Sequence, residues 1–157
     1  MKNQLRLQAK KNRAKIKLIL GKNCLLNIHI TYCLDQILSQ KQNIKSVALY
    51  YPMLDELSPL SFVQWFNLYN LKLALPIVCI QTKNLIFKEW DLNQDLKKGK
   101  LGNLEPLENS ILISPQVLIV PMLAFDKNLY RIGYGGGYYD KAINKLRSYF
   151  NTEKKDF

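Results

Sequence analysis

The sequence predicts one α/β domain over residues 1–157, in which three layers form around a mainly parallel central sheet flanked by helices. The length of 157 residues and the apolar share of 48% suit a single domain, because chains of this size bury roughly 70% of their unfolded surface. Segments with helical spacing alternate with short apolar runs, a pattern typical of α/β folds. A glycine cluster also precedes the last expected helix, where such sheets place their ligands.

The N-terminal third is expected to be helical. Residues 1–22 contain no acidic side chain and predict a basic helix that ends near Gly21. A second apolar stripe predicts a helix over Cys24–Leu38. The run Ser46–Tyr51 follows as the first expected strand, and Pro52 stops it.

The segment Asp55–Pro59 predicts the start of a helix that reaches about Leu71. Four aromatic side chains at helical spacing are expected to face the core rather than to stack on a ligand; they are Phe62, Trp65, Phe66 and Tyr69.

The rest of the chain alternates between strands and connections. Strands are expected at Leu73–Ile80, Leu85–Trp90 and Gln116–Pro121, and Asp91–Lys100 is interpreted as a polar connection. Tyr138–Phe150 predicts the last helix.

The net charge of +11 and the pI near 9.6 point to anionic partners. Polyphosphates, folate carboxylates, nucleic acid and membrane surfaces all fit that description, and a composition rich in Lys, Asn and Ile explains part of the excess without any function. Prolines and polar residues interrupt the most apolar region, Ile111–Phe125, which is too short to span a bilayer. We therefore expect a soluble protein without a membrane partner.

The cysteines argue against a metal centre built from thiolates. Cys24, Cys33 and Cys79 lie far apart and do not cluster with the single histidine, His29. Each has apolar neighbours, so we expect buried, reduced thiols. The N-terminus lacks the apolar core of a signal peptide, and both features favour a cytoplasmic protein.

The segment Arg131–Asp140 carries the strongest chemical pattern. It holds four of the chain's seven glycines within five residues, ahead of an expected helix. Backbone amides of such a loop can cradle an anion, and the helix N-terminus adds positive potential. Arg131 would supply fixed charge, and Asp140 could bind Mg²⁺ directly or through water. The alternative for a glycine run alone is a turn without a ligand.

This segment resembles the signature of the 5-formyltetrahydrofolate cyclo-ligases, in which an apolar strand, Pro and Phe-Asp precede Arg-Leu-Gly-Tyr-Gly-Gly-Gly-Tyr-Tyr-Asp. Here the pattern is read as Ile119–Asp126 followed by Arg131–Asp140, with one conservative change in the last ten residues. Weaker matches to the family occur upstream at Lys2–Arg6, Tyr50–Glu56 and Leu101–Pro106.

Some positions depart from the family pattern. Met122 and Leu129 stand where the family usually has Gly, and Leu101 stands where it often has an aromatic residue. Family members also continue into further strands with a second acidic residue linked to metal. The resemblance therefore implies that this chain lacks its C-terminal strands, and that activity is more affected than fold.

The resemblance implies the ATP- and Mg²⁺-dependent conversion of 5-formyltetrahydrofolate to 5,10-methenyltetrahydrofolate, ADP and phosphate. Catalytic charge would come from Lys2, Arg6 and Arg131, and Asp140 would face the metal. Nucleotide contacts are implied for Lys2, Arg6, Arg131, Gly133, Tyr134, Gly135, Gly136, Gly137, Tyr138 and Tyr139. Folate contacts are implied for Tyr51, Glu56, Tyr134, Gly135, Gly136, Gly137 and Tyr138.

Alternatives remain for these residues and for the chain. Lys2 and Arg6 could be solvated neighbours on one helix face, and Glu56 could be an ordinary first-turn residue of a helix. The chain could be a truncated relative that is weakly active or inactive, or a small basic module that binds nucleic acid. We expect a monomeric enzyme that acts on a small molecule and not on nucleic acid.

Overall fold

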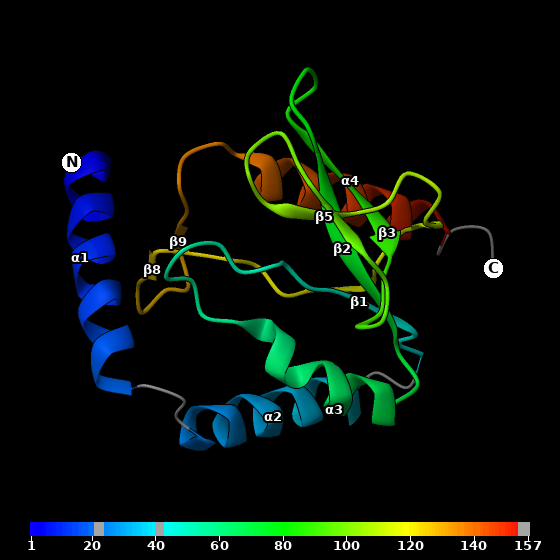
Figure 1. The fold of residues 1–157 in the computed structure, drawn as a ribbon, viewed down its shortest axis with the longest axis horizontal. Coiled ribbons are helices and arrows are strands. Elements are labelled where there is room, and N and C mark those ends of the chain that lie inside the picture. The colour runs from blue at the N-terminus through cyan, green and yellow to red at the C-terminus, as the bar shows by residue number, and fades with distance from the viewer. Residues whose placement is uncertain (21–23, 40–42, 154–157) are drawn as a thin grey trace.

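The computed structural model describes the backbone of residues 1–20, 24–39 and 43–153, and the side chains of 1–15, 31–39 and 43–152. Two helices come first, strands fill the middle, and a helix closes the described chain (Figure 1). The helical elements are α1 (Lys2–Leu20), α2 (Cys24–Ser39), the 3₁₀ turn η1 (Pro59–Phe62), α3 (Val63–Leu68) and α4 (Tyr138–Glu153). The strands are β1 (Ser46–Ala48), β2 (Lys72–Cys79), β3 (Asn84–Glu89), β4 (Leu96–Lys98), β5 (Leu104–Pro106), β6 (Leu112–Ile113), β7 (Val117–Leu118), β8 (Ala124–Phe125) and β9 (Arg131–Ile132).

The central sheet has five strands in the order β6-β3-β2-β1-β7. β1 lies between β2 and β7 and runs parallel to both, with Val47 opposite Leu73 on one side and Val117 on the other. β3 and β6 extend the sheet in antiparallel fashion. The expected parallel arrangement therefore describes the half of the sheet around β1, and the other half is antiparallel because β2 and β3 form a hairpin.

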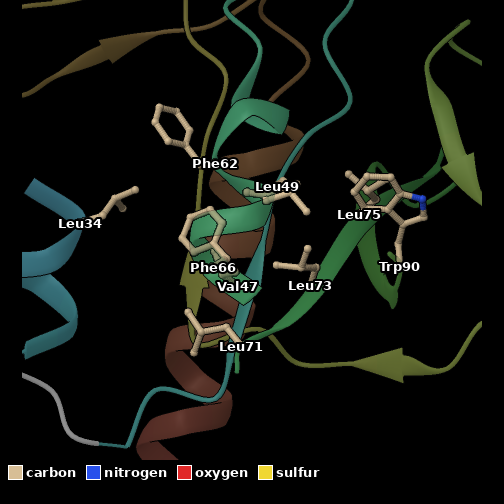
Figure 2. Close-up of a cluster of buried hydrophobic side chains, with 10 residues drawn as sticks. Leu34, Val47, Leu49, Phe62, Phe66, Leu71, Leu73, Leu75 and Trp90 are labelled. Atoms are coloured by element: carbon tan, nitrogen blue, oxygen red, sulfur yellow. The ribbon is translucent and has the colours of Figure 1, made fainter. Parts of the chain in front are cut away.

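One face of the sheet packs against α2 and α3 (Figure 2). Val47 and Leu49 alternate with Ala48 along the chain, so the larger side chains point to this face. Phe66 from α3 and Leu34 from α2 meet them there. Full burial of a side chain such as Phe66 contributes roughly 1.5–3 kcal/mol. Phe62 and Phe66 are buried as predicted and Trp65 packs against the same cluster, but Tyr69 is 45% exposed, so its expected place in the core is wrong.

The other face of the sheet packs against α4, which makes the domain three-layered (Figure 1). Ala48 and Ala74 point to this face and contact the cluster that contains Ala142 of the helix. Small side chains on both sides let the helix lie close to the sheet, and Phe87 fills the space beside them. The N-terminal end of α4 is thereby fixed near the carboxyl ends of the parallel strands.

Several expected elements differ in the structure. The strands expected at Ser46–Tyr51 and Gln116–Pro121 are shorter, because β1 ends at Ala48 and β7 spans only Val117–Leu118. Ser58 caps the helical segment and Pro59 begins it, as predicted, but the segment ends at Leu68 instead of near Leu71 because Asn70 adopts a φ of 52°. The presumed polar connection Asp91–Lys100 contains strand β4, which pairs with β5. That hairpin was not predicted because its residues are mostly polar and lack an apolar alternation.

The expectation of buried thiols is wrong for Cys33, which is exposed, and Cys79 is half-buried; both are free thiols. Cys33 precedes buried Leu34, and the helical step of about 100° turns it toward solvent. The side chains of Cys24 and His29 lie outside the described residues. None of the helices in the described part of the chain has the length and apolar character needed to cross a bilayer.

Candidate functional site

A cavity of about 480 Å³ opens where the parallel strands end. β1 leads into it through Tyr50 and Tyr51, β2 through Pro76 and Val78, and the segment after β7 through Pro121. The size lies within the range of small-molecule sites in proteins. Every site residue inferred from the sequence lines this cavity: Lys2, Arg6, Tyr51, Glu56, Arg131, Gly133, Tyr134, Gly135, Gly136, Gly137, Tyr138, Tyr139 and Asp140.

The glycine loop, Gly133–Gly137, is held between a small hairpin and helix α4. Strands β8 and β9 pair antiparallel and lead into the loop. Their turn is closed by Asp126, whose Oδ1 accepts hydrogen bonds from the backbone N–H groups of Asn128 (2.9 Å) and Tyr130 (3.0 Å). Leu129 in this turn has a φ of 64°. The family's usual Gly at this position is thus explained by a backbone conformation that suits glycine.

Helix α1 contacts the glycine loop through Arg6. The Arg6 Nε donates a 3.0 Å hydrogen bond to the carbonyl oxygen of Gly133. Gly135 has a φ of 104°, and a Cβ placed there would lie 3.2 Å from Nη2 of Arg6. Glycine therefore suits the backbone conformation and also leaves room for the close approach of the guanidinium group. Arg6 is not merely solvated on its helix face, whereas Lys2 is exposed at the rim of the cavity.

The N-terminal end of α4 supplies backbone donors and one carboxylate to the cavity. The first helical hydrogen bond runs from Lys141 N–H to Gly137 O, so the preceding N–H groups have no partner within the helix. Asp140 forms an ion pair with Arg131, and its side chain is 73% exposed. Positive potential from the helix end and an arginine thus lie beside the glycine loop, a combination that suits a phosphate group.

The described residues contain no cluster of three or more His, Cys, Asp or Glu side chains. An all-protein metal cage is therefore not formed there. Asp140 nevertheless fits the way in which Mg²⁺ is commonly bound, through one or two carboxylates together with substrate phosphates and water.

The turn Met53–Glu56, here called the acidic turn, forms the opposite wall. The Glu56 Oε2 accepts a hydrogen bond from the Met53 N–H at 3.0 Å, and Glu56 lies before the helical segment instead of in its first turn. The interpretation of Glu56 as a first-turn helix residue is thus wrong. Burial, and then the nearby Glu56 carboxylate, raises the pKa of Tyr50 to about 12. The same two causes raise the pKa of Tyr139, so both phenols stay protonated donors around Glu56.

The β4–β5 hairpin covers the cavity from a third side with Leu101 and Asn103. Its anchor is Glu105, which is only 4% exposed and accepts hydrogen bonds from the Val78 N–H (2.9 Å) and from Nδ2 of Asn103 (3.1 Å). A Cβ at Gly99 would lie 2.5 Å from Cδ of Glu105, so any larger residue there would displace this anchor. Sequence analysis did not identify this anchor, although the Leu101–Pro106 match contained it.

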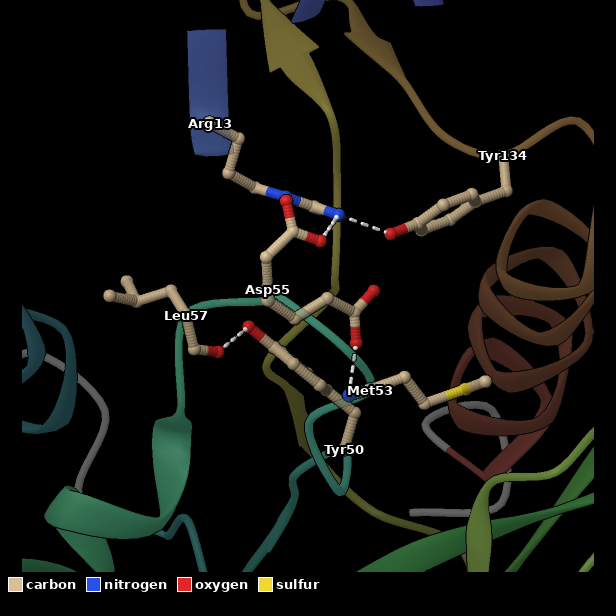
Figure 3. A network of polar contacts seen from close by, with 7 residues as sticks. Arg13, Tyr50, Met53, Asp55, Leu57 and Tyr134 are labelled. Atoms are coloured by element: carbon tan, nitrogen blue, oxygen red, sulfur yellow. Dashed lines mark hydrogen bonds and ion pairs between the residues drawn. The ribbon is translucent and has the colours of Figure 1, made fainter. Parts of the chain in front are cut away.

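Arg13 is a second residue that sequence analysis missed (Figure 3). Its Nη2 and Nε contact the Asp55 carboxylate at 2.9 and 3.3 Å, and Nη2 also donates to the hydroxyl of Tyr134. Burial opposes the charge of Arg13, but the hydrogen bonds to Asp55 and Tyr134 outweigh it and raise its pKa. Arg13 and Asp55 lie 42 positions apart in the chain, so no sequence pattern would have revealed the pair.

Comparison with known proteins agrees with this geometry. A protein of Haemophilus influenzae named 5-formyltetrahydrofolate cyclo-ligase is 29% identical over 116 residues, which cover 71% of this chain and 62% of that protein. A Mycoplasma genitalium protein of the same name is 31% identical, with 82% of this chain and 73% of that protein covered. The match to the first relative thus spans less than two thirds of that relative's length.

The fold is shared with solved structures as well. The NMR structure of Aquifex aeolicus 5,10-methenyltetrahydrofolate synthetase superposes with a TM-score of 0.68 at 26% identity, over 91% of this chain and 72% of that one. A sequence profile of the 5-formyltetrahydrofolate cyclo-ligase family matches residues 2–156. With the matching fold and with the family's glycine loop lining the cavity, this chain belongs to the 5-formyltetrahydrofolate cyclo-ligase family.

Proposed function

We propose that the protein converts 5-formyltetrahydrofolate and ATP to 5,10-methenyltetrahydrofolate, ADP and phosphate in a Mg²⁺-dependent reaction. The observation that carries this proposal is the single cavity into which the glycine loop, the N-terminal end of α4, Arg6 and the acidic turn all project. Cationic groups and backbone donors gather around the glycine loop, and Tyr50, Tyr51 and Glu56 line the wall formed with the acidic turn. This division suits a phosphorylated nucleotide next to a pterin.

The chemistry needs activation of a poor leaving group. The formyl oxygen attacks the γ-phosphorus of ATP, the bond to the β-γ bridging oxygen breaks, and ADP leaves. The neighbouring folate nitrogen then attacks the formyl carbon, loses its proton to solvent, and closes the ring as the C–O bond breaks and phosphate departs. The enzyme supplies position and charge in such a transfer and needs no covalent intermediate.

Each wall of the cavity has a proposed role. Lys2, Arg6 and Arg131 would neutralise the phosphates, together with the N–H groups of the glycine loop and of α4. Tyr51 and Glu56 would orient the pterin, with Glu56 accepting hydrogen bonds from its N–H groups. The remaining nucleotide and folate contacts are assigned to Tyr134, Gly135, Gly136, Gly137, Tyr138 and Tyr139.

Asp140 is proposed to hold Mg²⁺ on the phosphate side of the cavity. The metal would screen the negative charge that develops on the phosphate oxygens. Without ligands, Arg131 forms an ion pair with the carboxylate of Asp140. The phosphates could then take Arg131 as their partner and leave Asp140 to the cation.

The position of Arg6 supports the small-molecule role over nucleic-acid binding, because α1 directs this side chain into the cavity instead of presenting it on an open face. We further propose that the protein acts as a cytoplasmic monomer, and the free thiols of Cys33 and Cys79 fit a reducing compartment.

The test is an absorbance assay for methenyl-folate formation, run with ATP and Mg²⁺ and with either one omitted. The expected result is turnover that needs both. Calorimetry with a nonhydrolysable ATP analogue is run in parallel. Analogue binding without turnover would support the weakly active or inactive alternative, and steeply salt-dependent binding to random oligonucleotides without ATP binding would support the nucleic-acid alternative.

A further inference from the structure

Over residues 1–15, whose side chains the structure describes, helix α1 contacts the rest of the domain mainly through charged side chains. Among the side chains of residues 1–15, only those of Arg6, Ala9 and Arg13 are half-buried, and the others are exposed. The spacing of three and four residues places these three on one face of the helix. Leu5 and Leu7 are exposed, so apolar packing does not fix this part of α1. In this described part of α1, the contacts that hold the helix beside the cavity are polar.

The contacts of Arg13 reach two walls of the cavity at once (Figure 3). On one side the guanidinium group binds the Asp55 carboxylate through two nitrogens, and Asp55 belongs to the acidic turn. On the other side it donates to the hydroxyl of Tyr134 in the glycine loop, with Cζ 5.6 Å from the ring centroid. The Arg13 side chain is 16% exposed and that of Asp55 28%, so water screens this ion pair less than a surface pair.

We propose that Arg13 is a positioning residue of the cyclo-ligase site, which holds α1 against the acidic turn and the glycine loop and so fixes where Arg6 lies. Arg13 does not line the cavity itself, and it acts through Arg6, two helical turns away on the same face of α1. The planar guanidinium fork is required, because an ammonium group cannot bind the carboxylate through two nitrogens and reach the tyrosine in the same geometry.

The inference rests on the proposed function and is tested by a double-mutant cycle. Arg13→Lys keeps the charge and the helix propensity, and is expected to lower kcat/KM for ATP by about 10- to 100-fold, since a displacement of about 1 Å can cost 10²-fold. Arg6→Ala and the double variant complete the cycle. If Arg13 acts through Arg6, the double variant is little worse than Arg6→Ala alone; multiplication of the two losses would overturn the proposal.

A matched control and a second measurement separate this inference from the proposed function. Lys11→Ala removes a charge from the exposed face of α1 and is expected to leave turnover unchanged. Hydrogen exchange of the α1 amides in the ligand-free protein measures the attachment directly, because an undocked helix of this length is marginal in water. Arg13→Lys should exchange faster than Lys11→Ala over this helix. Equal exchange would overturn the inference whether or not the wild-type protein turns over folate.

Discussion

Replacing Gly135 by alanine tests the contact between the glycine loop and helix α1. The backbone at Gly135 has a φ of 104°, which L-residues rarely adopt, and the added Cβ would lie 3.2 Å from Nη2 and 3.3 Å from Cζ of Arg6. Either the loop or the guanidinium group must move. Because Arg6 donates to Gly133 O only two residues away, a shift of the guanidinium by a few tenths of an ångström would weaken that 3.0 Å hydrogen bond.

The expected cost has two parts. Backbone strain at such a φ amounts to about 1–3 kcal/mol and lowers the free energy of unfolding. Complete loss of a charged hydrogen bond amounts to about 1.5–3 kcal/mol, so its weakening costs at most this much, and this part affects ATP because Arg6 is proposed to face the phosphates. At about 1.4 kcal/mol per tenfold change, the affinity for ATP should fall measurably, by up to roughly 100-fold.

Calorimetry with a nonhydrolysable ATP analogue measures the affinity, and thermal unfolding measures the stability. Gly102→Ala is the matched control: Gly102 also has a positive φ, 83°, but its Cβ would meet no heavy atom within 4 Å. This control should lose stability and keep its affinity. If Gly135→Ala binds the analogue as tightly as the wild-type protein does, the approach of Arg6 to the loop has no part in nucleotide binding and our assignment of Arg6 is refuted.

Three further predictions concern other parts of the site. Asp140→Asn should keep the fold, because the side chain is 73% exposed. It should lower turnover at least tenfold at limiting Mg²⁺, because an amide binds a hard cation poorly. An unchanged Mg²⁺ titration would remove Asp140 from the metal role. Leu129→Gly should raise the free energy of unfolding by up to about 1 kcal/mol. Glycine relieves the strain at a φ of 64°, which outweighs the larger entropy that glycine loses on folding, and the exposed leucine, at 81%, gives up little packing. A lower Tm would contradict this. Burial, and then Glu56, raises the pKa of Tyr50 to about 12, so the folded state binds its proton more tightly than the unfolded state does. The resulting stability is present below pH 10 and is lost between pH 10 and 12. Denaturation against pH should show this alkaline loss in the wild-type protein and a smaller one in Tyr50→Phe.

The sequence predicted much of the fold because local patterns dominate in those elements. The helices at α1, α2 and α4 and the strands β2 and β3 follow from spacing alone. The early end of α3 was missed because the positive φ of Asn70 is a property of the folded backbone. The antiparallel half of the sheet was missed as well, since the direction of β3 depends on the tight turn after β2 and not on its apolar pattern.

The sequence by itself determined the family, because the segment Arg131–Asp140 is long and its glycines have few other uses, and it predicted site residues that all lie along one cavity. Only the tertiary structure decided how these residues are held. The Arg13–Asp55 pair joins positions 42 residues apart, and Glu105 accepts from a strand 27 residues earlier. Such contacts form when chain segments meet in three dimensions, and a charged side chain is exposed or buried according to what packs beside it. The identity of a side chain fixes what it can bind, but its partner is fixed by the fold.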